Sequence, residues 1–345
     1  MKRNLIYLLL TALIISCQSY KTMQFDVLRP ATYSVPPEIK SVVLVNNAFP
    51  YNPEKAHIAS VDGEKVLLDT IRVDSLASII IQQLKEDFDL RRFFDTVYVD
   101  TTQYNTFKSG KPYKPLEQSQ IINICNQYGA DAVLSVSAAE YGSNINVEDM
   151  GVEYFATMDV YGMIYWRLYD GYSTKALHAK VQRDTLFWSG VGADVNASVS
   201  LFPRIKDATI ELGHYLGANY VDVLVPYWEP VERKVYIAGN QHFVNAVDWL
   251  NKDNRFEAEK LWGYVYAHGK EREKGRAANN IAVSMEARGE LDLAMEWAYK
   301  SFEAFGKVGF MLNSEEMRTS KDLYLDMVRR QRDRKKLDEQ IGGGK

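Results

Sequence analysis

Side chains that could take part in catalysis are scattered along the sequence rather than grouped at the spacings of known active sites. No two histidines have the His-x-x-x-His spacing of a helical zinc site. Gly190-Val191-Gly192 lacks the third glycine of a dinucleotide-binding loop, so we interpret it as a turn. The five histidines are His57, His178, His214, His242 and His268. The pattern predicts no catalytic residues and no metal ligands.

Cys125 is the one thiol in the body of the chain that could act as a nucleophile. It lies at helical spacing beside Ile121 and Ile124, on the apolar face of a predicted helix. A thiol in apolar surroundings keeps its proton and is a poor nucleophile. We therefore expect Cys125 to be buried and inert.

One enzymatic alternative stays open. Residues 47–68 and 143–153 contain segments that could form loops, and these segments carry Asp62, Glu148 and Asp149. A hydrolase whose site is spread over these loops is therefore an alternative to a protein without catalytic activity.

The first seventeen residues carry a second kind of chemistry. Lys2 and Arg3 precede an apolar run at residues 5–15, which is shorter than the roughly 20 residues of a membrane-spanning helix. The run ends in Ile14-Ile15-Ser16-Cys17, which resembles the lipobox of bacterial lipoproteins. The resemblance implies that residues 1–16 are a signal peptide and that Cys17 carries covalent diacylglycerol and acyl lipid.

The residues after Cys17 resemble the sorting signal of outer-membrane lipoproteins. No acidic residue occurs from Gln18 to Thr22, and the first one is Asp26. Retention in the inner membrane would place an aspartate beside the cysteine, and export to the cell surface would place acidic residues shortly after it. The resemblance therefore implies an outer-membrane lipoprotein that faces the periplasm.

The rest of the 345-residue chain has the composition of a folded protein of two domains, with 46% hydrophobic and 25% charged residues. The net charge of −4 argues against a nucleic-acid-binding protein, which would carry a basic surface. Residues 17–38 contain Pro30, Pro36 and Pro37, and we expect them to form a lipidated, extended tether.

Alternating strand and helix patterns predict an α/β domain at residues 39–237. Strands are expected at 40–45, 95–99 and 130–136, with parallel pairing through right-handed crossovers. Residues 47–68 would form a long loop or a small hairpin. Asp69 or Thr70 is the expected cap of the first helix, and Gly129 is the expected end of the second. The apolar stripe of the first helix is Val73, Leu76, Ala77, Ile80, Leu84 and Phe88.

The pattern then changes to long β-type segments at residues 154–169 and 176–188. The loop Asp170-Gly171-Tyr172-Ser173-Thr174 has residue types typical of a β-hairpin turn, so the two segments are expected to pair antiparallel. A helix from about Pro203 to Asn219 follows, and the domain closes near Tyr236. The predicted fold class is therefore α+β, with a mixed-sheet α/β domain (βαβαβ, β-hairpin, α) followed by an all-α domain. The apolar face of the last helix is Ile205, Ala208, Leu212, Tyr215 and Leu216.

The order of these elements resembles a small domain of envelope proteins. The resemblance rests on the strand at 40–45, on the helix from Ile121 to Gly129 that runs into Ala130-Asp131-Ala132-Val133-Leu134, and on the hairpin. The domain is similar to the amino-terminal region of TolB, to CsgG-type secretion lipoproteins and to lipoprotein activators of cell-wall synthases. The chain as a whole resembles a family of envelope lipoproteins of unknown function. None of these relatives implies a catalytic residue.

Residues 241–345 are helical in composition and contain an internal repeat. Ala246, Trp249, Ala258 and Trp262 are matched 36 residues later by Ala282, Met285, Ala294 and Ala298. This resembles the tetratricopeptide pattern of paired helices, whose repeat has about 34 residues. Ala298 departs from that pattern, because an aromatic residue is usual there. We expect two repeats and a capping helix from Ser314 to about Glu339.

The tetratricopeptide resemblance implies a groove that holds a peptide backbone through paired asparagines. The alternative is that Asn279 and Asn280 cap or solvate a helix. The residues implied as contacts of a partner are Asn245, Trp249, Asn279, Asn280 and Val283.

A row of aromatic residues on the first long β-type segment is a second candidate for partner binding. Alternation places Tyr161, Tyr165 and Tyr169 on one face of the strand and Trp166 on the other. Core packing is one explanation of these tyrosines, and an exposed aromatic platform at an interface is the other.

The last helix carries a basic run that is expected to be solvated, or else to contact lipid headgroups. The run consists of Arg329, Arg330, Arg332, Arg334, Lys335 and Lys336.

Together these patterns favour a non-enzymatic outer-membrane lipoprotein that acts as a protein–protein adaptor or assembly factor in the cell envelope. The expected partners are envelope proteins and, through the lipid on Cys17, the outer membrane. No nucleic acid and no further cofactor are expected. A self-associating ring subunit of the CsgG type is the structural alternative, and it ranks lower because the sequence lacks an obvious membrane-crossing hairpin.

Overall fold

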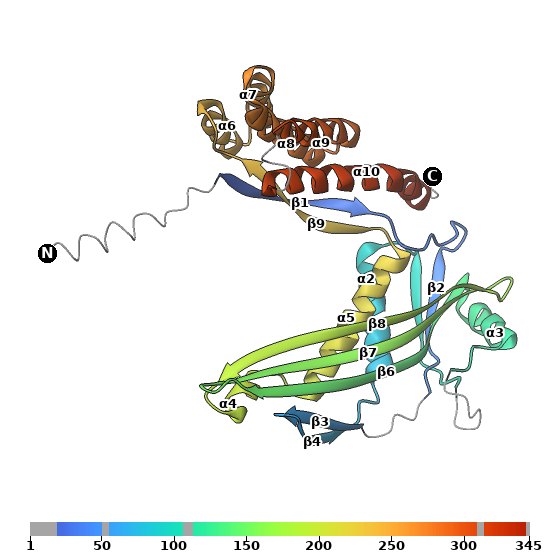
Figure 1. The fold of residues 1–345 in the computed structure, drawn as a ribbon. Helices are drawn as coiled ribbons and strands as arrows, with labels where there is room; N and C mark the ends of the chain where they lie inside the picture. Colours follow the sequence, from blue (N-terminus) through green and yellow to red (C-terminus); the bar gives the residue numbers. More distant parts are fainter. Residues whose placement is uncertain (1–18, 50–54, 106–112, 309–313, 343–345) are drawn as a thin grey trace. The chain divides into compact units, whose positions relative to one another are not determined.

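In a computed structural model, residues 19–49, 55–105, 113–308 and 314–342 of the protein are described, and the chain divides into two compact units (Figure 1). The α/β unit runs from Ala31 to Val225. The helical unit combines the segment ending at Pro30 with the segment beginning at Pro226. The predicted signal peptide and Cys17 lie outside the described residues, so the lipid attachment stays a prediction.

A seven-stranded mixed sheet forms the centre of the α/β unit. β2 pairs in parallel with β5 and β6, as the crossover pattern predicts. β7 pairs antiparallel with β6 on one side and β8 on the other, which confirms the predicted hairpin. β6 continues far beyond the end predicted from the sequence. The strands are β2 (Ser41–Asn46), β3 (Lys55–Val61), β4 (Glu64–Ile71), β5 (Thr96–Asp100), β6 (Ala132–Asp149), β7 (Tyr154–Asp170) and β8 (Ala176–Gly192).

The segment at residues 47–68 contains the small hairpin that was one of its two expected forms. Asp62 and Gly63 join β3 to β4 with φ angles of 50° and 86°, which suits a tight hairpin turn. β3 also pairs in parallel with the far half of β6, so this hairpin extends the sheet. The predicted helix cap at Asp69 or Thr70 is wrong, because both residues belong to β4 and the helix follows Ser75.

Helices cover the two faces of the sheet unequally. α2 (Leu76–Arg91) and α5 (Ile205–Leu224) pack on one face, here called the inner face. α3 (Gln118–Tyr128) packs on the opposite, outer face, against β2 and the start of β6. α4 (Val195–Val199) lies against the ends of β7 and β8. Tyr215 was predicted to point inward from α5 and is instead exposed.

Asp131 fastens the start of β6 to the start of β2. Its Oδ2 accepts hydrogen bonds from the backbone N–H groups of Lys40 and Ser41, both at 2.9 Å, and from the Ser41 hydroxyl at 2.8 Å. Burial raises the pKa of Asp131, but the hydrogen bonds from Ser41 and Lys40 outweigh it, so this pKa lies below its ordinary value. The Gly-Ala-Asp sequence before β6 therefore has a structural role.

The helical unit begins with a two-stranded ribbon. β1 (Tyr20–Arg29) pairs antiparallel with β9 (Tyr227–Tyr236), from Tyr20 opposite Tyr236 to Arg29 opposite Tyr227. The predicted tether at residues 17–38 is therefore wrong where it overlaps β1. The α/β domain was also predicted to close near Tyr236, yet β9 belongs to the helical unit because its partner is β1.

The helices that follow β9 form two pairs and a final long helix, as the internal repeat predicts. Ala246, Ala258, Ala282, Ala294 and Ala298 are all buried where the helices meet. Other helical repeats share this arrangement, so the tetratricopeptide resemblance stays a prediction. Within the described residues, none of the helices has the length and apolar composition needed to cross a membrane. The helices are α6 (Gln241–Asn251), α7 (Arg255–His268), α8 (Glu271–Ala287), α9 (Leu291–Gly306) and α10 (Glu315–Gly342).

We expect Asp131→Asn to destabilise the α/β unit by about 1–3 kcal/mol at neutral pH, because three donors lose their charged acceptor. The folded-state pKa of Asp131 is lowered, so its carboxylate stabilises the fold above the ordinary value of 3.8 and loses this effect as the pH falls through the folded value. Urea unfolding followed by circular dichroism, at neutral pH and below pH 3.8, measures the effect. A difference between wild type and variant that does not shrink in acid would contradict this role.

Candidate functional site

Among the residues that the structure describes, a helix covers one end of the outer face of β6, β7 and β8. There α3 and Leu116 pack over Val133 and Tyr169, and the Leu116 N–H donates a hydrogen bond to the Tyr169 hydroxyl at 3.3 Å. The three strands extend well beyond α3 (Figure 1). Among the described helices, none packs on the outer face of this extension.

Alternation along β7 assigns each side chain to one face. Even-numbered residues from Ala156 to Leu168 are buried against the inner face, and odd-numbered residues up to Arg167 are exposed or half-buried. Trp166 points inward, where its ring stacks on Tyr220 of α5 at 3.9 Å and its Nε1 donates to Gln182 Oε1 at 2.8 Å. Tyr161, Tyr165 and Tyr169 share the outer side, in line with the alternation of the sequence.

The three tyrosines on this side have different surroundings. Tyr169 is only 4% exposed because α3 covers it, so its predicted contact with a partner is wrong. Tyr165 is half-buried, and the Arg167 guanidinium lies 4.1 Å from the centre of its ring. Tyr161 is 50% exposed, and its ring lies flat over Gly142, where a Cβ would approach Cζ to 2.5 Å.

Exposed apolar side chains lie on this face of β7 and β8, among polar ones such as Asp159, Arg183 and Thr185. We call Phe155, Tyr161, Val181, Phe187 and Val191 the outer patch. Phe187 is the most exposed of them, at 61%. Beside the patch lies a hollow of about 640 Å³ whose lining includes Glu140, Tyr161, Met163, Arg183 and Thr185.

The sequence analysis did not predict the β8 residues of the outer patch, although the sequence contains a signal for them. Val181 and Phe187 occupy odd positions on a segment that was correctly predicted as a strand, and Val191 continues the same series. Once Tyr161 is placed on the outer side, the antiparallel pairing with β7 places these residues there as well.

In the helical unit, the asparagines predicted to hold a partner's backbone hold the chain's own strand β9. Asn280 accepts from the Tyr236 N–H and donates to the Tyr236 carbonyl, both at 2.7 Å. Asn279 donates to the Lys234 carbonyl at 2.7 Å. Because Asn279, Asn280 and Val283 are buried, the prediction that they contact a partner is wrong. Asn245 and Trp249 are exposed on α6, as that prediction requires.

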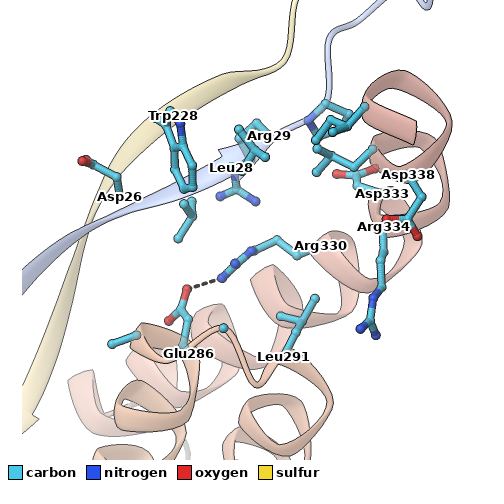
Figure 2. A pocket seen from close by; sticks show the side chains of 16 residues that line it. Asp26, Leu28, Arg29, Trp228, Glu286, Leu291, Arg330, Asp333, Arg334 and Asp338 are labelled. Atoms are coloured by element: carbon cyan, nitrogen blue, oxygen red, sulfur yellow. Dashed lines mark hydrogen bonds and ion pairs between the residues drawn. The ribbon is translucent and has the colours of Figure 1, made fainter. Parts of the chain in front are cut away.

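A pocket of about 440 Å³ lies at the end of β1 and is lined by charged side chains (Figure 2). Glu286 of α8 forms ion pairs with Arg330 of α10 at 2.6 Å and with Arg233 of β9 at 2.8 Å. Arg29 of β1 forms one with Asp326 of α10 at 3.0 Å. These ion pairs join β1 and β9 to the helices, so Arg29, Glu286 and Arg330 of the pocket stabilise the fold.

Part of the basic run is buried in this ion-pair network and is not solvated. Burial lowers the pKa of Arg330, and the nearby Arg29 and Arg233 lower it further against the opposing effect of Glu286. Arg330 is thus a partly buried ion-pair partner, and its predicted solvation is wrong. Arg329 and Arg334 are also paired, with Asp326 at 2.5 Å and Asp292 at 3.1 Å.

The residues of the hydrolase alternative have structural partners. Asp62 Oδ1 accepts a hydrogen bond from the Asp149 N–H at 2.9 Å, which ties the β3–β4 turn to the end of β6. Glu148 accepts one from Asn146 at 2.9 Å. Over the ranges that the structure describes, no three histidine, cysteine or acidic side chains are grouped as a metal site would require.

Cys125 is buried, as predicted from the sequence. Burial raises the pKa of its thiol to about 11, and the charges of Asp131 and Asp170 contribute to this rise. The thiol is therefore protonated at neutral pH, which does not suit a nucleophile.

Two family models match the chain. One, described as a domain of unknown function (DUF8603), matches residues 39–236, and the other, described as a domain of unknown function (DUF6340), matches residues 242–330. Neither is a TolB or tetratricopeptide model, so these resemblances stay predictions. Comparison with curated proteins gives no match.

Several solved structures show similarity at low identity. The PelC dodecamer from Paraburkholderia phytofirmans is 12% identical, with 59% of this chain and 99% of that chain covered and a TM-score of 0.26. The LpoB C-terminal domain from Salmonella enterica is 14% identical, with 42% of this chain and 83% of that chain covered and a TM-score of 0.17. At these TM-scores the similarities carry no argument about function.

We expect Asn280→Ala to destabilise the helical unit by about 2–4 kcal/mol, because it leaves the buried N–H and C=O of Tyr236 without a side-chain partner. The matched control is Asn245→Ala on exposed α6, which should stay within about 0.5 kcal/mol of wild type. Thermal and urea unfolding measure both. Equal effects of the two variants would show that Asn280 does not hold β9.

Proposed function

The chain belongs to the family described as a domain of unknown function (DUF8603), and we propose that it acts as a non-enzymatic protein-interaction module of the cell envelope. In this proposal the outer patch is the docking surface for an envelope protein. The proposal includes a lipid anchor on Cys17 and a location at the outer membrane, facing the periplasm. The lipobox-like sequence at residues 14–17 supports the anchor, and the residues that follow it support the location.

The observation that carries the proposal is the exposure of aromatic and aliphatic side chains on the part of the outer face that no described helix covers. The side chains are neighbours through the strand register. Val181 lies opposite Tyr165, Phe187 lies diagonal to Tyr161, and Val191 lies opposite Phe155. Exposed aromatic and aliphatic side chains that neighbour one another are typical of protein interfaces.

The other side of the same strands supports the proposal, because it makes the patch rigid. Gly162 leaves room for Leu216 of α5, whose Cδ1 would lie 2.8 Å from a Cβ at that position. The stacked rings of Trp166 and Tyr220 pack beside this contact. A surface fixed in this way loses little conformational entropy when a partner binds, which favours affinity.

The position of β1 in the sequence implies a short connection to the proposed anchor. β1 begins at Tyr20, three residues after Cys17, which is at most about 11 Å of extended chain. With lipid on Cys17, the start of the β1–β9 ribbon would therefore lie close to the membrane surface. A single acyl chain gives reversible attachment, whereas the several chains expected on a lipoprotein cysteine give a stable one.

We expect the double variant Tyr161→Ser/Phe187→Ser to lose the envelope partner, because it removes the two most exposed aromatic side chains of the outer patch. The control is Tyr172→Ser/Tyr215→Ser, which alters exposed tyrosines of the hairpin turn and of α5. In-cell cross-linking followed by affinity capture of the full-length chain gives the readout. The control should recover the same partner as wild type.

Thermal unfolding separates lost docking from lost folding, since exposed residues should leave the melting temperature nearly unchanged. Equal recovery of the partner by both double variants would contradict the docking surface. A Cys17→Ser arm tests the anchor by itself. It should abolish incorporation of a labelled fatty acid and release the chain from the membrane fraction, and continued labelling would contradict lipidation at Cys17.

A further inference from the structure

β8 is a long strand with one open edge. It pairs with β7 along one side, and no other described strand pairs with it. α4 packs on the inner face at its far end, where a Cβ on Gly190 would lie 2.4 Å from the Ser198 carbonyl oxygen. The stretch of the edge clear of α4 runs from Ala176 to Trp188. Such an edge presents unpaired backbone N–H and C=O groups to which a further strand can bond.

Two opposite charges lie on this edge. Lys180 and Asp184 point to the inner side of β8, and each is half-buried. Neither forms an ion pair with another residue in the described ranges, and Asp184 accepts a hydrogen bond from Gln182 Nε2 at 3.3 Å. In an edge-to-edge pair each of these charges could gain an opposite charge across the edge.

We propose that two copies of this chain pair antiparallel through the open edge of β8, about a two-fold axis at Gln182. In this register Lys180 of each copy lies opposite Asp184 of the other. The pairing involves residues 176–188 of both copies, which is the stretch that α4 leaves open. It joins the two sheets into one continuous sheet.

Charge complementarity selects this register from its neighbours. Residues directly opposite each other in an antiparallel pair point to the same face, so an even-numbered residue must meet an even-numbered one. An axis at residue 180, 183 or 184 would oppose Lys180, Arg183 or Asp184 to itself. An axis at 181 would place Lys180 opposite Gln182 and form no Lys–Asp pair. Like charges directly opposite destabilise a pair, whereas two Lys–Asp pairs stabilise the register centred on Gln182.

The same charges would have a different role in a chain that stays monomeric. An inward-pointing lysine on an edge strand is a known device against unwanted pairing. Asp184 removes this protection in one register only, because there each lysine meets an opposite charge. The pair thus permits one specific partner, a second copy in one alignment.

The pairing would place the two outer patches on one face of one sheet. Val181 would lie opposite Arg183 of the second copy, so the patches would flank the two-fold axis. Self-pairing does not depend on the proposed envelope partner, because it uses the edge and inner-side charges of β8 and not the outer patch.

Sedimentation equilibrium of the full chain in mild detergent tests the pairing. The wild type should be a dimer. Lys180→Asp and Asp184→Lys should each raise the dissociation constant of the dimer about tenfold or more, because each variant creates two like-charged pairs. The combined variant Lys180→Asp/Asp184→Lys should restore the wild-type dissociation constant. Lys175→Asp in the exposed turn before β8 is a charge-matched control that should leave the dimer unchanged.

Rescue in the combined variant is the outcome that a general effect on folding cannot produce, and circular dichroism melts verify that each variant is folded. A wild type that stays monomeric at its highest soluble concentration would overturn the proposal. A dissociation constant that is unchanged in all three variants would also overturn it. So would a combined variant whose dissociation constant is as high as those of the single variants. None of these results would affect the docking proposed for the outer patch.

Discussion

The stacking of Trp166 on Tyr220 is the interaction on which the arrangement of the long strands depends. It fixes β7 to α5, and the hydrogen bond from Trp166 to Gln182 extends the attachment to β8. Because side chains alternate along a strand, Trp166 on the inner face requires Tyr161 and Phe187 on the outer face. A slip of one residue would bury the outer patch and expose the tryptophan, so the core and the proposed docking surface specify each other.

The helical unit shows how groups that resemble a binding site can be used by the fold itself. Asn279 and Asn280 bind the backbone of β9, as asparagines of a repeat groove would bind a peptide. Arg330, from the predicted solvated run, is paired with buried Glu286. Of the two surfaces predicted to bind a partner, the strand face does expose aromatic side chains. The exposed ones are Tyr161 and Phe187, whereas Tyr169 is buried.

Local patterns predicted most elements of the fold, whereas pairings between distant segments were not predictable. The parallel strands, the helix that ends at Gly129 and the long hairpin follow from periodicity within short windows. β1 was missed because its partner β9 lies about 200 residues away and neighbouring prolines resemble those of a tether. Gly190 and Gly192 were read as a turn but lie in β8, where their lack of a side chain admits α4. The burial of Tyr169 likewise depends on α3, which no pattern near Tyr169 reveals.

The central claim is that the outer patch contacts an envelope protein, and photo-cross-linking from single positions in living cells tests it most directly. A photoreactive amino acid would replace Phe187, Tyr161, Tyr172 or Tyr215, one at a time, in the full chain. The account predicts that positions 187 and 161 give an adduct with the same protein and that positions 172 and 215 give none. Adducts from 172 or 215, together with none from 187 and 161, would contradict it.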